Sequence, residues 1–386
     1  MKRVYYLYVM VIFLGCIDTS LEDISNETIP NFSITLNNLE LSPEFNSNII
    51  AVDDNTFITA VQDEESNIEV IRISQEFTND VWELNTETLY EGLIGKLSFF
   101  KQAENDYLLG YIDNIGKVKL LRLDANFDVS AESGNYLSFI DTTYNKVDSI
   151  FFHDVSYLDP ANNILLGGLV YTFGTYYSCV LAINDMLEPQ WIKTYFEESE
   201  IIGIAQTSME NYFLLNNNAQ GTELIRDNQS GSAYQKYNLS NDKLFFGGES
   251  LVTNDKLLLT GIHNDIGRTI EVDLLSNTTF VNEIENYPVS QFRSLQLSRN
   301  SLATAGVQSE ISGNKQFSSE LGPTGSLWCH KYIDETYFKI LDIIELPGKG
   351  ILISSVVERD SKFFLHLTRI DEEGATFVNE YTENCL

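Results

Sequence analysis

The chain contains few basic residues. Its 386 residues include 24 Lys and Arg against 56 Asp and Glu, so the formal net charge is −32 at pH 7. This balance excludes nucleic acid as the expected partner, because phosphate binding needs a basic surface. A net charge this far from zero instead favours solubility and disfavours non-specific association.

Recognisable catalytic and cofactor motifs are also missing. The sequence has no Gly-x-Ser-x-Gly nucleophile turn, no His-Glu-x-x-His zinc motif and no phosphate-binding loop. Asp53-Asp54 and similar pairs lack the spacing of a calcium-binding EF-hand loop. No two histidines have the spacing of metal ligands: His153, His263, His330 and His366. We therefore predict no cofactor; carboxylates in this number could hold calcium, but the sequence places no such site.

The apolar run at the N-terminus is too short for a permanent membrane span. Val4 to Leu14 are 11 residues, whereas a transmembrane helix needs about 20. Lys2 and Arg3 precede this run. A short apolar run behind two positive charges is typical of a secretory signal peptide, which we expect over residues 1–15.

Phe13-Leu14-Gly15-Cys16 resembles the lipobox of bacterial lipoproteins, with Phe13 in place of the usual Leu. The resemblance implies cleavage before Cys16, which would then carry a diacylglyceryl thioether and an N-acyl chain such as palmitate. Two or three acyl chains give stable membrane anchoring. The resemblance also implies that the protein lies in the cell envelope, and we expect it to be anchored in the outer membrane. The alternative is an ordinary signal peptide with an incidental cysteine.

Residues 16–31 form an acidic stretch with little apolar patterning. No Lys or Arg occurs between Cys16 and Ile71, and Arg72 is the first base after the leader. This composition predicts a flexible tether. An acidic stretch after a lipidated cysteine resembles the surface-export signal of some Gram-negative lipoproteins. The alternative is a spacer that keeps the domain away from an anionic membrane.

Units of about fifty residues with strand-like patterning recur along the rest of the chain. Period-two alternation between charged or Gly-containing turns predicts successive antiparallel strands, most clearly after Gly350. The pentapeptide at 376–380 is repeated identically at 279–283. The aligned apolar runs begin at Phe57, Leu108, Ile164, Tyr212, Leu257, Leu302 and Ile351.

Each unit has room for four strands, so seven units predict an all-β fold: a seven-bladed β-propeller with four antiparallel strands per blade. We expect a single domain over residues 32–386. Its repeats are expected at 44–94, 95–147, 148–197, 198–241, 242–287, 288–334 and 335–382. Trp82, Trp191 and Trp328 recur early in the fourth strands, where large rings would pack between blades.

An additional strand candidate, Phe32 to Leu36, precedes the first repeat. Many propellers close their ring by adding an N-terminal strand to the last blade. Here the sequence already predicts a fourth strand for the last repeat, Ala375 to Tyr381. The N-terminal strand therefore either caps an outer edge, or the strand count of one blade is off by one.

The end of the third strand resembles the units of secreted bacterial propellers related to the quinoprotein-like group. Their pattern has Leu-Asp, a Gly after two residues, and then Trp and Tyr; Ile370-Asp371, Gly374, Phe377 and Tyr381 match it best. The resemblance implies the propeller fold. It does not imply a quinone cofactor, because seven units are found rather than eight and no ligand set matches.

Three cysteines follow Cys16. Cys329 lies in the fourth strand of repeat six and Cys385 follows the fourth strand of repeat seven. Neighbouring blades could bring these two together, so a disulfide between Cys329 and Cys385 is a hypothesis that an exported compartment would permit. We expect Cys179 to be a small buried residue.

We therefore expect a membrane-anchored, exported lipoprotein that acts as a non-catalytic binding or scaffold module. Short propeller loops converge on two faces and would present a surface to a protein or glycan partner. The alternative is a cell-surface enzyme that cleaves polysaccharide with channel-facing carboxylates contributed by different blades. The sequence selects no pair of carboxylates for that role.

Overall fold

The structure is a computed structural model that describes residues 32–371 and 382–384, with gaps at 44, 46, 79–80, 104–105, 135, 137–138, 140–147, 158–163, 207–210, 229–234, 241–250, 254–255, 264–265, 274–277, 284–288, 311–312, 323–324 and 333–334. The expected signal peptide and tether therefore lie outside the described residues. Within this described part, no helix is both long and apolar enough to cross a membrane.

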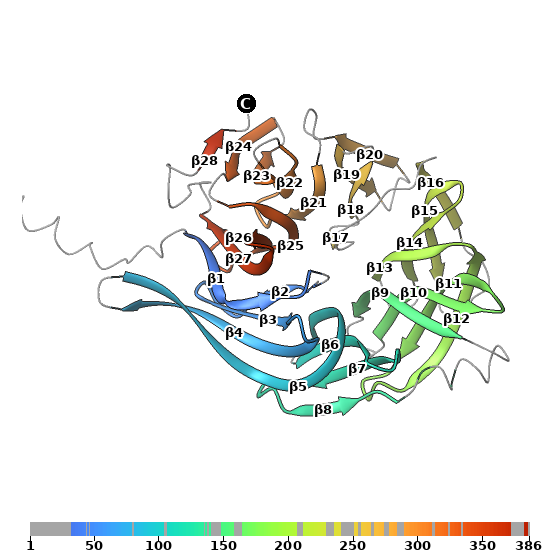
Figure 1. Cartoon of the computed structure of the whole chain (residues 1–386). Coiled ribbons are helices and arrows are strands. Elements are labelled where there is room, and N and C mark those ends of the chain that lie inside the picture. Colours follow the sequence, from blue (N-terminus) through green and yellow to red (C-terminus); the bar gives the residue numbers. More distant parts are fainter. Residues whose placement is uncertain are drawn as a thin grey trace, which may run out of the picture. The chain divides into compact units, whose positions relative to one another are not determined.

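The described elements are antiparallel β-sheets (Figure 1). Four sheets have four strands each: β9 (Ser149–Tyr157), β10 (Ile164–Thr172), β11 (Thr175–Ile183) and β12 (Pro189–Glu197); β13 (Glu200–Gln206), β14 (Asn211–Asn218), β15 (Gly221–Asn228) and β16 (Gln235–Ser240); β17 (Leu251–Thr253), β18 (Lys256–His263), β19 (Ile266–Asp273) and β20 (Thr278–Glu283); and β25 (Tyr337–Glu345), β26 (Ile351–Arg359) and β27 (Lys362–Ile370) with β1 (Phe32–Leu41).

Two sheets are larger. One has five strands: β21 (Val289–Gln296), β22 (Leu302–Gln308), β23 (Lys315–Gly322), β24 (Gly325–Tyr332) and β28 (Thr382–Asn384). The other has seven: β2 (Ile49–Ala51), β3 (Thr56–Gln62), β4 (Asn67–Thr78), β5 (Val81–Ala103), β6 (Asp106–Asp113), β7 (Val118–Leu123) and β8 (Val129–Glu132).

The apolar cores lie between neighbouring sheets. Leu165 of β10 and Val180 of β11 belong to the same buried cluster as Ile201 of β13 and Leu214 of β14, and the partly buried Trp191 packs against it. Leu166, the next residue of β10, belongs to another buried cluster, so both faces of this sheet are covered. Coverage of both faces explains why a second strand such as β26 is buried at seven consecutive residues rather than at alternate ones. The predicted packing role of Trp191 is confirmed.

Strand β5 belongs to two four-stranded units. Its first part pairs with β4 up to Ile94, and from Gly95 onward it pairs with β6. The change of partner falls where the sequence predicts the boundary between the first two repeats. At the change, a Cβ on Gly95 would lie 2.2 Å from the carbonyl oxygen of Ile112, so only glycine fits the close approach of the two backbones.

The N-terminal strand β1 is the fourth strand of the last sheet. It pairs antiparallel with β27, with Phe32 opposite Arg369 and Leu36 opposite Leu365 (Figure 1). The place beside β27 that the sequence assigned to residues 375–381 is thus taken by β1, and that assignment was wrong. Those residues lie outside the described part, and the next described strand, β28, pairs with β24 instead.

A capped turn recurs after the third strand. The side chain of Asp124 accepts hydrogen bonds from the backbone N–H groups of Asn126 and Asp128, at 2.8 and 3.0 Å. Asn184 caps the corresponding turn between β11 and β12 in the same way. The fourth residue of each turn is a buried apolar residue with positive φ, 65° at Phe127 and 60° at Leu187.

Candidate functional site

The predicted lipid-attachment residue Cys16 and the cysteine Cys385 lie outside the described residues. Cys329, on β24, is disulfide-bonded. Cys179 is a free, fully buried thiol, and burial raises its pKa strongly. A thiol in this environment is unreactive, so Cys179 is a packing residue.

The described histidines take part in packing and hydrogen bonding. The ring of His330 stacks on Trp328 with centroids 5.4 Å apart, whereas His366 is only 1% exposed. The side chains of His153 and His263 are outside the description. Among the described side chains, no group of three His, Cys, Asp or Glu residues could hold a metal ion.

His366 joins the N-terminal strand to the rest of its sheet. Its Nε2 is 3.0 Å from Ser33 Oγ and its Nδ1 is 2.9 Å from Thr35 Oγ1, so both ring nitrogens bond to β1. Thr35 also donates to Glu335 Oε1 at 3.0 Å, and Arg359 Nε donates to Glu335 Oε2 at 2.9 Å. This network, which we call the clasp, ties β1 to β27 and to the ends of the neighbouring strands through buried and partly buried polar groups.

A second set of bonds joins the last sheet to the first strands of the seven-stranded sheet. The Arg369 guanidinium, 7% exposed, donates to the carbonyl oxygen of Asp54 at 2.6 Å and to Gln75 Oε1 at 3.1 Å. Asp342 Oδ2 on β25 accepts from the backbone N–H of Ile49 at 3.0 Å. These contacts close the fold between residues that are 293 to 315 positions apart in the sequence.

Glu320 is a buried carboxylate with four donors. Arg299 approaches it with two nitrogens, Nε and Nη2, both at 2.6 Å, and Trp328 Nε1 donates at 2.9 Å. Ser301 Oγ supplies the fourth hydrogen bond. Burial alone would raise the pKa of Glu320, but these hydrogen bonds and the Arg299 charge outweigh it and leave the pKa lowered.

The exposed aromatic side chains that the structure describes lie at one edge of the sheets. In an antiparallel sheet with strands in chain order, the first strand starts at the edge where the second ends, and we call this the leading edge. Among the described residues, the exposed aromatics are Phe151, Tyr171, Phe173 and Phe338. Phe151 and Phe338 are near the starts of the first strands β9 and β25, and Tyr171 and Phe173 are at the end of β10. Sequence reasoning missed this grouping.

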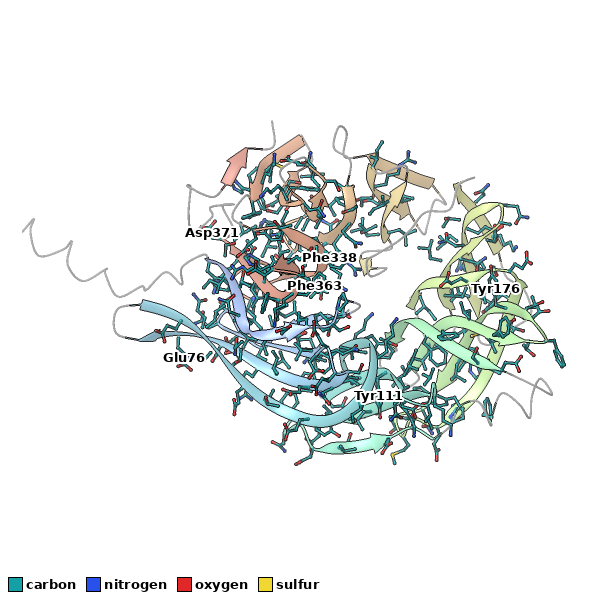
Figure 2. All side chains as sticks on the ribbon, in the orientation of Figure 1. Glu76, Tyr111, Tyr176, Phe338, Phe363 and Asp371 are labelled. Carbon is teal, nitrogen blue, oxygen red and sulfur yellow. The ribbon has the colours of Figure 1, made fainter. Side chains whose placement is uncertain are left out.

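The leading edge also holds partly buried aromatic rings. Phe338 packs against Phe363 with ring centroids 4.8 Å apart; Figure 2 labels both residues. Tyr176, labelled in the same figure, is partly exposed and pairs across the β10–β11 hairpin with Tyr171. The other exposed hydrophobic residues that the structure describes are not aromatic and occur at both edges: Ile94 and Ile115 at the leading edge, and Val52, Val129, Met186 and Leu327 at the opposite edge.

Comparison with known proteins identifies the fold and no family. No family model matches the sequence, and no curated protein matches it. The structure of BBS1N in complex with ARL6DN is similar over 88% of this chain and 97% of that chain, with a TM-score of 0.54 and 9% identity. The structure of the Dos1 propeller is similar over 90% of this chain and 91% of that chain, with a TM-score of 0.48 and 10% identity.

The chain is an all-β propeller. A structure from an analysis of two prolyl endopeptidases is also similar, over 82% of this chain and 49% of that chain, with a TM-score of 0.50 and 8% identity. The structural similarity establishes the propeller fold with its four-stranded antiparallel blades. Because the sequence identities are this low, it does not extend to function, which has to be argued from the surface. In propellers the loops and strand ends at the two faces are the surfaces available to partners.

Proposed function

We propose that this propeller is a membrane-anchored, exported lipoprotein that acts as a non-catalytic binding or scaffold module for a protein or glycan partner. The observation that supports binding is the leading edge, where all the exposed aromatic side chains of the described residues occur. A soluble domain gains nothing in stability from rings in water, and grouped exposed rings are typical of interaction sites.

The proposed anchor is Cys16, acylated after removal of residues 1–15 and held in the outer membrane of the cell envelope. The acidic segment 16–31 would then connect the lipid to β1. Metabolic labelling with radioactive palmitate should label the wild-type chain and leave Cys16→Ser unlabelled and soluble after membrane fractionation. Labelled or membrane-bound Cys16→Ser protein would contradict the proposed anchor.

We further propose that the ring has seven blades. The seven-stranded sheet divides at Gly95 into two four-stranded blades that share β5, and β28 extends a four-stranded blade made of β21 to β24. First strands of successive units are in contact, as in the pairs β9 with β13, β21 with β25, and β25 with β2. The last of these pairs returns to the first unit. A crystal structure with another number of four-stranded blades would contradict this count.

Cys385 is the proposed partner of Cys329. Strands β24 and β28 pair with His330 opposite Asn384, and the same register continued by one residue would pair Cys329 with Cys385. Because Cys179 is free and Cys16 is assigned to the lipid, Cys385 is the cysteine left for the bond. The disulfide would fasten the C-terminal strand to the outside of its blade.

Binding at the leading edge is testable in cells that export the full chain. A photo-cross-linking phenylalanine analogue at position 173 should give a discrete adduct after irradiation. The same analogue at position 186 is the matched control, because Met186 is also highly exposed, at 59%, but lies on the opposite edge. Equal adducts at the two positions, or none at position 173, would refute the proposed binding function.

A further inference from the structure

The tip of the β10–β11 hairpin is the most exposed aromatic feature of the described surface. Phe173 is 72% exposed, more than any other large hydrophobic residue described, and Tyr171 is 38% exposed. Tyr171 lies opposite Tyr176, and Phe173 is in the turn that joins their strands, so the three rings belong to the last residues of one hairpin. We call Tyr171, Phe173 and Tyr176 the aromatic tip.

The fold itself gives no reason for phenylalanine at position 173. Phe173 and Gly174 form the two-residue turn, with φ of 51° and 82°. Two positive φ values define a type I′ turn, for which Asn-Gly is the favoured sequence and a bulky first residue is disfavoured. The ring is also outside the core, so neither the local backbone nor packing explains it.

Two exposed carboxylates stand on either side of the aromatic tip. The backbone N–H of Asp148 donates to the Tyr171 carbonyl oxygen at 2.9 Å, and that of Glu198 donates to the Tyr176 carbonyl oxygen at 2.9 Å. These bonds fix both acidic residues against the hairpin, and both side chains are exposed. The tip is thus flanked by negative charge from the segments before β9 and after β12.

Positive charge is scarce in this part of the chain. Between Asp148 and Glu200 the sequence contains a single Lys or Arg, Lys193. Its ammonium group forms an ion pair with Asp227, whose carboxylate is fully buried. Lys193 is therefore committed to the contact between two blades and does not offset the charge of Asp148 and Glu198.

We propose that the aromatic tip docks a polypeptide segment bearing Lys or Arg side chains. Cations are attracted to the faces of aromatic rings, and the flanking carboxylates would pair with the same groups. Anionic lipid surfaces and anionic glycans would be repelled by this site, and a neutral glycan would make no use of its charge. The inference rests on the proposed binding function and names the chemistry of its partner.

The test compares variants of the mature full-length protein in detergent, with oligo-arginine as the probe. Phe173→Asn removes the ring and supplies the residue that the turn favours, so this variant should fold at least as stably as the wild type. We expect its affinity for oligo-arginine to fall about fivefold. Met186→Asn, which replaces another highly exposed hydrophobic residue at the opposite edge, should leave the affinity unchanged.

The charge contribution is tested by the double variant D148N and E198N. Asparagine also tolerates the positive φ of 53° at Glu198. We expect a further loss of affinity and a weaker dependence of binding on salt, whereas D128N at the opposite edge should behave like the wild type. Oligo-glutamate and a neutral oligosaccharide serve as the other probes.

Two outcomes overturn the inference. Oligo-arginine could bind Phe173→Asn and Met186→Asn equally, which would mean that only the overall negative charge attracts it. Alternatively, the neutral oligosaccharide could bind in a manner that depends on Phe173 while oligo-arginine does not. After either outcome, the photo-cross-linking experiment in cells separates the two proposals. A cross-linked adduct at position 173 would mean that the binding function stands and the partner class is wrong, whereas the absence of this adduct would mean that both are wrong.

Discussion

Replacing Glu320 by Gln removes a buried negative charge while keeping the size of the side chain. The carboxylate is 1% exposed and receives four hydrogen bonds, two of them from Arg299. Removing one partner of a buried ion pair costs about 3–5 kcal/mol. Arg299 remains 23% exposed and can still contact water, so we expect the low end of that range, about 3 kcal/mol.

This loss should be visible as a lower melting temperature. With an unfolding entropy of about 2 cal/mol/K per residue, a loss of about 3 kcal/mol lowers the Tm of a chain of 386 residues by about 4 °C. Circular dichroism at neutral pH measures it. The control is Glu87→Gln, whose partner Arg72 lies at 2.8 Å but whose ion pair is exposed, with side chains 64% and 40% accessible. Breaking such a surface pair should cost less than about 1 kcal/mol.

The same pair of proteins should also differ in how their stability depends on pH, and the direction of this dependence can be predicted. Because the pKa of Glu320 is lowered in the folded protein, the unfolded state binds more protons in the acid range. The stability from this group is therefore present above its ordinary pKa of 4.5 and is lost as the pH falls through the folded value. Gln does not titrate, so the stability gap between wild type and E320Q should narrow in acid. A gap that stays constant, or one no larger than that of E87Q at pH 7, would refute the reasoning.

Three further predictions concern unfolding measured with urea. Asn216→Leu should stabilise the protein by about 1 kcal/mol, because the buried amide nitrogen and oxygen of Asn216 have no hydrogen-bond partner in the described part of the chain; a loss of stability would contradict this. Arg369→Met should cost about 2 kcal/mol, since the Asp54 carbonyl oxygen loses its donor, and an unchanged midpoint would speak against the closing role. Cys329→Ser should lower the free energy of unfolding by about 2–4 kcal/mol relative to the oxidised wild type. When the disulfide of the wild type is reduced, the two proteins should be equally stable. Peptide mapping without reductant should also recover Cys329 joined to Cys385, and a free Cys385 would disprove that pairing.

Local alternation predicted the strands well because each strand is determined by residues adjacent in sequence. Which strands pair with each other was harder to predict. Phe32 to Leu36 and Ala375 to Tyr381 alternate equally well, and nothing local decides which pairs with β27. The deciding contacts, such as Ser33 with His366, join residues 333 positions apart. Sequence spacing contains no information about such a contact until a structure brings the strands together.

The turns show a second limit of sequence reasoning. The repeat pattern in the sequence has Gly374 three residues after Asp371, but the residues at the same distance from Asp124 and Asn184 are Phe127 and Leu187, both with positive φ. Apolar packing of these side chains outweighs the local cost of positive φ. The signal that could have revealed the turns is the capping Asp124 or Asn184 three residues earlier. The aromatic tip left a similar signal, a Phe-Gly pair where a hairpin favours Asn-Gly.

The position of β1 links the proposed anchor to the stability of the ring. If Cys16 holds the lipid, any load on the tether reaches the propeller first at Phe32, where β1 begins to pair with Arg369 of β27. The hydrogen bonds of Ser33 and Thr35 with His366 lie within the first residues of that strand. An anchor attached to a closing strand would open the fold if the strand could peel away. The clasp therefore lies where peeling would have to start. Its hydrogen bond between Thr35 and His366 is fully buried, and a buried hydrogen bond is costly to break because both groups lose their partner before water reaches them.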